Sequence, residues 1–84
     1  WPRRSILQDS IVHSESGTQT AFVRDASAGG LGLGRVKGLR RGDRLRVEMA
    51  NGRMLHGAVV WSSAGSAGIR FDEPLAATDL LIAV

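Results

Sequence analysis

Short runs in which apolar and polar residues alternate, separated by turn signals, make up most of this chain. The clearest run covers residues 43–49, where apolar side chains at every second position predict a strand with one buried and one solvated face. The Asn-Gly dipeptide at residues 51–52 favours a two-residue type I′ hairpin, so residues 53–62 are expected to pair back on that strand. Residues 64–66 predict a further turn into a strand over residues 67–71.

The first half of the chain carries a weaker β pattern. Residues 5–14 form the first expected strand, a turn follows at residues 15–17, and the β-favouring residues 18–24 predict an antiparallel return. Residues 31–36, in which glycines alternate with leucines, predict a short third strand. Residues 1–4 are polar, contain proline and predict an irregular N-terminal segment.

The C-terminal residues 76–84 leave two alternatives open. They form one or two helical turns capped by Thr78 or Asp79, or they form a final extended segment. Five or six short strands with regular turn signals and little helix predict an all-β antiparallel barrel.

Composition narrows the classes of function. A chain of 84 residues predicts a single domain over residues 1–84. Cysteine is absent, and the two isolated histidines, His13 and His56, predict no metal site. Because no apolar run reaches the roughly 18 residues that span a bilayer, we expect a soluble, cytoplasmic protein. No Ser-His-Asp arrangement is visible, so we expect neither enzyme activity nor catalytic residues.

The candidate binding residues lie within residues 24–33. Asp25 offers two acceptor oxygens and Ser27 a hydroxyl group, both near the end of an expected strand. Gly29 and Gly30 permit a positive φ, and the alternating glycines that follow leave a face of bare backbone that a flat ring or a phosphate can approach. The same residues also fit ordinary turn chemistry, in which the Asp and Ser side chains bond to the local backbone.

Asp25, Ser27 and Gly30 form the pattern D-x-S-x-x-G, which in this context resembles the second signature of PilZ domains, bacterial receptors for cyclic di-GMP. The resemblance covers nearly the whole chain, because residues 43–61 and 67–75 are similar to the later strands of that family. It implies a small six-stranded antiparallel β-barrel with a C-terminal helix. It also implies cyclic di-GMP as a signalling ligand, with no cofactor, and we expect a downstream protein partner.

The same resemblance assigns a role to each residue of the pattern. Asp25 would accept hydrogen bonds from the guanine N1 and N2 donors, Ser27 would bond to a phosphate or to the amino group, and Gly30 would hold the backbone conformation.

PilZ domains carry a second motif, R-x-x-x-R, on the segment before the first strand. Arg3 and Arg4 stand where its second arginine would be, whereas the first arginine would fall before residue 1. Arginine suits this role because its planar fork bonds bidentately to phosphate and to guanine O6 and N7. We expect residues 1–4 to be mobile without ligand and to fold over the D-x-S-x-x-G surface when the nucleotide binds.

Two other functions stay open. Either the sequence as given is cut short before Trp1, or the arginine motif is degenerate. In the second case the chain is a PilZ-like domain that has lost the nucleotide and serves as a protein-interaction module. The chain also has 11 basic against 8 acidic residues, and a small basic β-barrel that binds RNA or DNA would use six of the basic ones. These six are Arg35, Lys37, Arg40, Arg41, Arg44 and Arg46. With two Trp and two Phe, the chain has few rings on which bases could stack, so nucleic acid is not the expected partner. Trp61 follows two valines and is interpreted as core or barrel-rim packing, with a position bordering the ligand as the other alternative.

Overall fold

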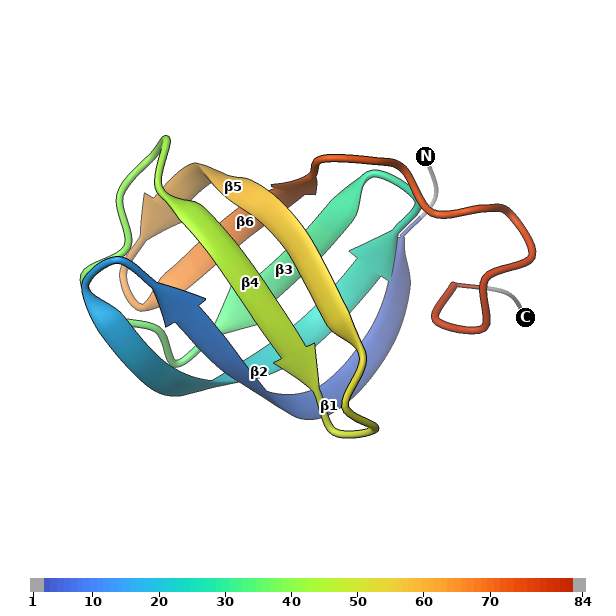
Figure 1. The fold of residues 1–84 in the computed structure, drawn as a ribbon, viewed down its shortest axis with the longest axis horizontal. Helices are drawn as coiled ribbons and strands as arrows, with labels where there is room; N and C mark the ends of the chain where they lie inside the picture. The colour runs from blue at the N-terminus through green and yellow to red at the C-terminus, as the bar shows by residue number, and fades with distance from the viewer. Residues whose placement is uncertain (1–2, 83–84) are drawn as a thin grey trace.

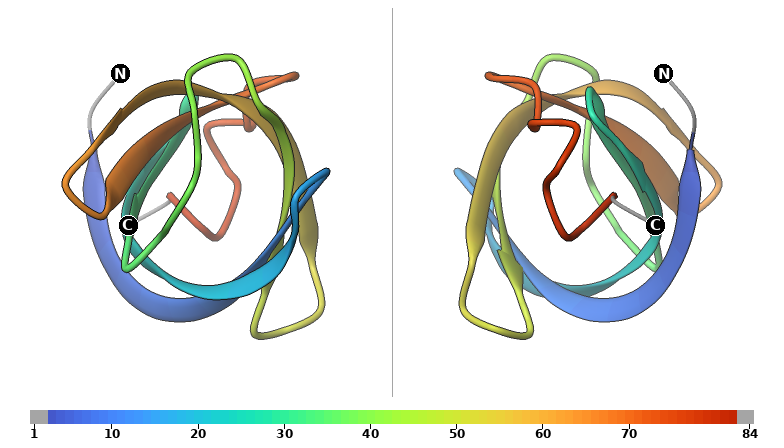
Figure 2. Two further views of the ribbon diagram at one scale, coloured as in Figure 1. Left: turned by 90° about the vertical axis from the view of Figure 1, so that its left-hand side faces the viewer. Right: turned by 90° about the vertical axis from the view of Figure 1, so that its right-hand side faces the viewer.

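Six antiparallel strands close into a barrel in the computed structural model, which describes residues 3–82 (Figure 1). The strands are β1 (Arg4–Ser14), β2 (Gly17–Ser27), β3 (Gly30–Gly34), β4 (Arg44–Met49), β5 (Met54–Ser63) and β6 (Ser66–Phe71). Their order around the barrel is β1-β2-β3-β6-β5-β4, and β4 pairs back on β1. Figure 2 shows the strands curving around one common interior. The expected six-stranded antiparallel barrel is therefore confirmed.

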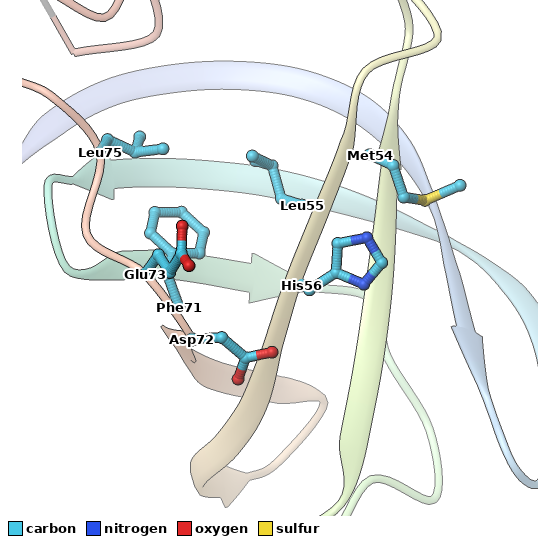
Figure 3. A pocket seen from close by; sticks show the side chains of 7 residues that line it. All are labelled: Met54, Leu55, His56, Phe71, Asp72, Glu73 and Leu75. Carbon is cyan, nitrogen blue, oxygen red and sulfur yellow. The ribbon is translucent and has the colours of Figure 1, made fainter.

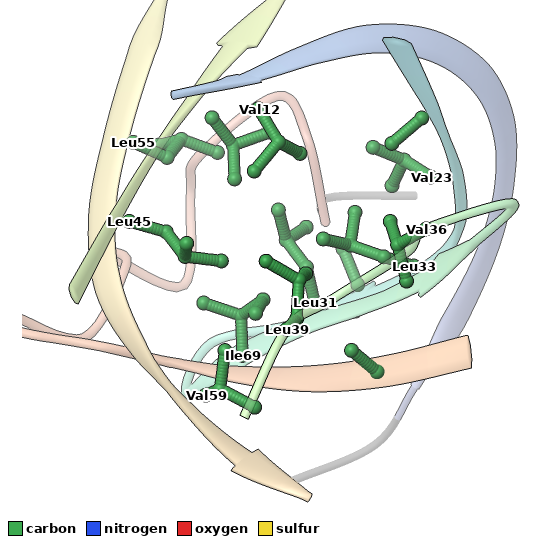
Figure 4. Packing of buried hydrophobic residues seen from close by; sticks show 14 of the residues in the cluster. Val12, Val23, Leu31, Leu33, Val36, Leu39, Leu45, Leu55, Val59 and Ile69 are labelled. Atoms are coloured by element: carbon green, nitrogen blue, oxygen red, sulfur yellow. The ribbon is translucent and has the colours of Figure 1, made fainter. Parts of the chain in front are cut away.

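Alternation along the strands decides which side chains fill the barrel. Apolar residues at every second position point inward and pack together in the barrel (Figure 4). The largest side chains with less than 2% exposure are Leu31, Leu33, Val12, Val23, Val47 and Val59. On β3 the two leucines point into the interior, so the glycines beside them face outward. These glycines are nevertheless buried, because the Asp25 side chain lies over Gly32 and the Arg24 side chain lies over Gly34.

Three register shifts break this alternation. They lie between Ser5 and Gln8 on β1, between Val23 and Asp25 on β2, and between Val59 and Trp61 on β5. The β2 shift is a β-bulge, because one more residue is present on β2 than on the paired stretch of β3. Its effect is to put Arg24 and Asp25 together on the outer face, between the fully buried Val23 and the next buried alanine.

Gly30 is required by a close approach of two backbones. A Cβ atom added at Gly30 would lie 1.9 Å from the carbonyl oxygen of Ile69 on β6. Neither Gly29 nor Gly30 has a positive φ, so the conformational freedom that glycine permits is not used at either position. Glycine is needed here because β3 and β6 lie too close for a side chain.

The turns differ in type from the sequence expectation. The loop between β4 and β5 spans residues 50–52, and only Gly52 in it has a positive φ. The Asn51 side chain accepts a hydrogen bond from the Arg53 N–H at 2.9 Å, which favours this longer turn. The predicted two-residue type I′ turn is therefore wrong at this position. Two consecutive residues with positive φ, as a type I′ turn requires, occur in the turn between β5 and β6, at Ala64 and Gly65.

The strand limits also shift at both ends. β1 begins at Arg4, whose Cα pairs with Ala26, so Arg4 is not part of an irregular segment as expected. Trp1 and Pro2, which we also expected to be irregular and mobile, lie outside the described residues. β3 ends at Gly34 instead of residue 36, because Arg35 turns the chain with a φ of 60°.

The chain after β6 forms turns and not a helix. Asp79 N–H donates to the Ala76 carbonyl at 2.9 Å and Ile82 N–H to the Asp79 carbonyl at 3.0 Å, which are isolated turn bonds. Up to residue 82, neither the expected short helix nor a final strand forms. The reason is that the Asp79 carboxylate is bound by Arg53 and by the Leu81 N–H, which holds the segment in turns. The described chain also offers no helix of the length and apolar character needed to cross a bilayer.

Candidate functional site

One row of paired residues crosses the outer face of four neighbouring strands. Asp25 on β2 pairs with Gly32 on β3, Gly32 pairs with Gly68 on β6, and Gly68 pairs with Trp61 on β5. On the other side of Asp25 the row continues to Ser5 of β1. We call the backbone of Gly32 and Gly68, with Asp25 at one end and Trp61 at the other, the glycine shelf.

The side chains at the two ends of the glycine shelf lie over its glycines. A Cβ atom added at Gly32 would be 2.6 Å from Oδ1 of Asp25, and one added at Gly68 would be 2.0 Å from Nε1 of Trp61. Any other residue at these two positions would push the carboxylate and the indole away. The shelf thus presents one carboxylate with two acceptor oxygens and one aromatic ring, both lying over a strip of backbone without side chains, which suits a planar ligand with N–H donors.

Trp61 lies on the outer face and not in the core. The register shift after Val59 leaves Val60 and Trp61 both outside, with 41% and 46% of their surface exposed. The interpretation of Trp61 as core packing is therefore wrong. The sequence carried a usable signal, since Gly68 follows in the next strand and glycines often mark positions where another group approaches closely.

The structure joins Asp25 to Arg3. Arg3 Nη1 donates a hydrogen bond to Asp25 Oδ1, although 51% of the arginine and 34% of the aspartate side chain remain exposed. Arg4 begins β1 and pairs with Ala26, the residue after Asp25. The two arginines expected to belong to the site therefore lie beside the D-x-S-x-x-G segment, and one of them contacts it directly.

Ser27 and Gly30 have structural roles in this state. Ser27 is only 6% exposed, and its Oγ accepts a hydrogen bond from the Gly29 N–H at 3.3 Å. Its Cα pairs with Gly30 across the short turn between β2 and β3. The turn-chemistry alternative thus describes Ser27, whereas Asp25 points to Arg3 and the glycine shelf.

A pocket of about 290 Å³ lies between β5 and the chain that follows β6 (Figure 3). It is lined by Met54, Leu55, His56, Phe71, Asp72, Glu73 and Leu75. Phe71 and Asp72 hold this side of the pocket in place, through backbone hydrogen bonds to Gly29 and His56. The pocket shares no residue with the glycine shelf, and nothing in its lining combines an acidic acceptor with bare backbone.

The six basic residues of the nucleic-acid alternative do not share one face. Arg35 lies over the Phe22 ring, 5.4 Å from its centroid, next to β3. Arg44 instead bonds to Asp72, which raises the pKa of that guanidinium. Arg46 lies on β4, between β1 and β5. Around the closed barrel, β4 is three strands away from β3 in either direction.

The histidines lie on either side of Arg46, on β1 and β5. His13 Nε2 is 3.0 Å from Glu48 Oε1, and its Nδ1 is 3.3 Å from Thr18 Oγ1. Among residues 3–82, no group of three or more His, Cys, Asp or Glu side chains is placed to hold a metal ion.

Comparison with known proteins agrees with this geometry. The model of the PilZ domain family matches residues 2–83. A search of curated proteins finds no match. The match covers all six strands of the closed barrel. The chain therefore belongs to the PilZ domain family, a family of non-catalytic domains that are receptors for cyclic di-GMP.

Proposed function

We propose that this chain is a receptor for cyclic di-GMP and that it binds a guanine on the glycine shelf. The observation that carries this proposal is the contact between Arg3 and Asp25, because it joins the residues of two separate motifs at one surface. Asp25 presents two acceptor oxygens, which match the N1–H and N2–H donors on one edge of guanine. Ring and backbone surfaces on the shelf match the flat faces of the base.

Arg3 and Asp25 exchange partners when the ligand binds. Without ligand, Arg3 neutralises the Asp25 carboxylate at a half-exposed surface, where such an ion pair contributes only about 0 to 1 kcal/mol. Guanine donors replace Arg3 on Asp25, and the freed guanidinium then bonds to a phosphate or to guanine O6 and N7. Arg4 lies next to this surface, while Ser27 turns from Gly29 towards the ligand.

The alternative is a module that binds a protein and no nucleotide. One observation in its favour is that the Ser27 hydroxyl already accepts a hydrogen bond from the Gly29 N–H. Another is that two large apolar side chains are exposed, Leu7 at 67% and Trp61 at 46% of their surface. The two functions differ in their dependence on Asp25, because an apolar protein contact does not need its carboxylate.

Titration calorimetry with cyclic di-GMP tests the proposal. The protein should include the residues encoded before Trp1, and it should be compared with the variant Asp25→Asn. The control variant is Asp9→Asn, which removes an exposed carboxylate on the neighbouring strand β1. We expect heat of binding for the native chain and the control, and a loss of at least tenfold in affinity for Asp25→Asn. The absence of both binding heat and a melting shift with the native chain would rule out the receptor function and leave the interaction module.

A further inference from the structure

Two arginines lie on either side of the row that contains Asp25, on the same outer face of the barrel. Arg24 reaches the row of Gly34 and Ser66, while Arg70 belongs to the row of Gly30. Outward positions on a strand repeat every second residue, so each of these rows is about 7 Å from the Asp25 row. The distance between the edge of the base and the phosphate within one nucleotide is comparable to this spacing between the rows.

Arg24 is held across β3. The bulge on β2 directs it outward, and its stem lies over Gly34, where an added Cβ atom would be 3.2 Å from the Arg24 Cδ. Its Nη1 donates to Ser66 Oγ on β6 at 3.3 Å. Among residues 3–82 it has no carboxylate partner. The guanidinium is thus oriented by a neutral hydroxyl and keeps its full charge for an anion.

Arg70 faces outward from β6 and is exposed. Its neighbours on the two adjacent strands are Gly30 and Ala58, so no large side chain stands on either side of it. It too lacks a carboxylate partner within the described part of the chain. Its guanidinium therefore meets no large side chain on the strands beside it, and it lies next to Gly30, which pairs with Ser27.

Other arginines of the barrel are used differently. Arg44 and Arg53 each bond to an aspartate, Asp72 and Asp79 respectively, and these ion pairs tie the C-terminal segment to the barrel. Arg24 and Arg70 have no such structural role through a carboxylate. Their placement beside glycines suits an anion site, because neighbours without side chains leave the guanidinium groups open to a phosphate.

We propose that Arg24 and Arg70 bind the phosphodiester groups of the ligand whose guanine lies on the glycine shelf. This inference rests on the proposed receptor function and adds cations on the β3 and β6 side, opposite the side from which Arg3 and Arg4 approach. The two arginines supply positive charge in addition to that of Arg3 and Arg4. Each can bond to two phosphate oxygens through its planar fork.

The test compares Arg24→Gln, Arg70→Gln and the double variant with Arg46→Gln. Arg46 is the matched control, because it is also an exposed arginine on a strand but lies on β4, on the opposite side of the barrel from β3. Calorimetry with cyclic di-GMP is carried out at low and at high salt. We expect each single variant to weaken binding at least tenfold and to make its salt dependence shallower, since a screened charge pair has been removed. Arg46→Gln should stay within twofold of the native chain.

If Arg24→Gln does not fold, Arg24→Lys replaces it in the test, because lysine keeps both the charge and an aliphatic stem over Gly34. Arg24→Lys should still weaken binding, because the planar guanidinium fork is lost. Melting curves without ligand establish that each variant is folded. If the native chain binds cyclic di-GMP while folded variants at positions 24 and 70 bind equally tightly with the same salt dependence, this inference is overturned and the receptor function stands. If the native chain does not bind, the receptor function itself fails, and the inference with it.

Discussion

Gly30 and Gly32 stand two residues apart on β3, yet a methyl group added at each would meet a different kind of neighbour. At Gly30 the obstacle is the backbone carbonyl of Ile69, 1.9 Å away, which cannot move without separating β3 from β6. At Gly32 it is the Asp25 carboxylate, 2.6 Å away at the end of a side chain that can rotate. The first glycine is therefore needed for the fold, and the second for the position of a candidate binding group.

Alanine substitution at the two positions should separate stability from binding. We expect Gly30→Ala to lower the free energy of unfolding by about 1 to 3 kcal/mol, the usual cost of an overpacked site. Gly32→Ala should change stability by less than about 1 kcal/mol but should weaken cyclic di-GMP binding, because Asp25 is displaced. Denaturant unfolding and calorimetry measure the two effects. Equal loss of stability in both variants would contradict this assignment of roles.

Among the elements, the segment that follows β6 is attached to the barrel by ion pairs, of which Arg53–Asp79 is the one nearer the C-terminus. Arg53 donates two hydrogen bonds of 2.6 Å to Asp79, whose side chain is only 14% exposed. The Arg53 hydrogen bonds, followed by that of the Leu81 N–H, lower the pKa of Asp79 from 3.8 to about 2, although partial burial acts in the opposite direction. These charge pairs act together with the partly buried side chains of Leu75, Leu81 and Ile82, which pack against the core.

This attachment should depend on pH in the acid range. Because the pKa of Asp79 is lower in the folded state than in the unfolded state, its contribution is complete above about pH 4 and is lost as pH falls towards 2. Its size is about 1 kcal/mol once the exposure of Arg53 is taken into account. Titration by NMR should find the low pKa, and faster amide exchange at Leu81 and Ile82 should accompany protonation. In Arg53→Gln the Asp79 pKa should return towards 4; an unchanged value would contradict the ion-pair explanation.

For the whole molecule, ligand binding should act on the cooperative unfolding of the barrel. A ligand that binds only the folded state, at a hundred times its dissociation constant, stabilises it by about 2.7 kcal/mol. In a domain of this size each kcal/mol raises the melting temperature by roughly 4 to 8 °C, so a shift of about 10 °C or more is expected with cyclic di-GMP.

Changes at exposed site residues should reduce this shift and leave the melting temperature of the free domain nearly unchanged. Arg3→Ala is the most direct case, because its exposed pair with Asp25 contributes about 1 kcal/mol or less. Thermal melts with and without ligand measure both quantities. If Arg3→Ala unfolded the free domain, Arg3 would be a structural residue and its proposed exchange between Asp25 and the ligand would have to be abandoned.

Local pattern by itself determined most of the strands and the residues of the candidate motif. Alternation at residues 43–49 and the turn signal at residues 64–66 act over neighbouring residues, so they could be interpreted without knowing the rest of the fold. The D-x-S-x-x-G pattern likewise pointed to Asp25 as a candidate binding residue before any geometry was known. A resemblance over nearly the whole chain then implied six strands in a barrel, which local pattern left at five or six.

Features that depend on contacts between strands could be established only from the folded structure. The β2 bulge that turns Asp25 outward exists because β2 carries one residue more than the stretch of β3 with which it pairs, and single-strand alternation does not contain that information. The same holds for Gly30, whose need for glycine comes from the backbone of β6, and for Arg3, which meets Asp25 across 22 residues of sequence. The C-terminal turns follow from the hydrogen bonds of Arg53 to Asp79, two residues that only the closed barrel brings together.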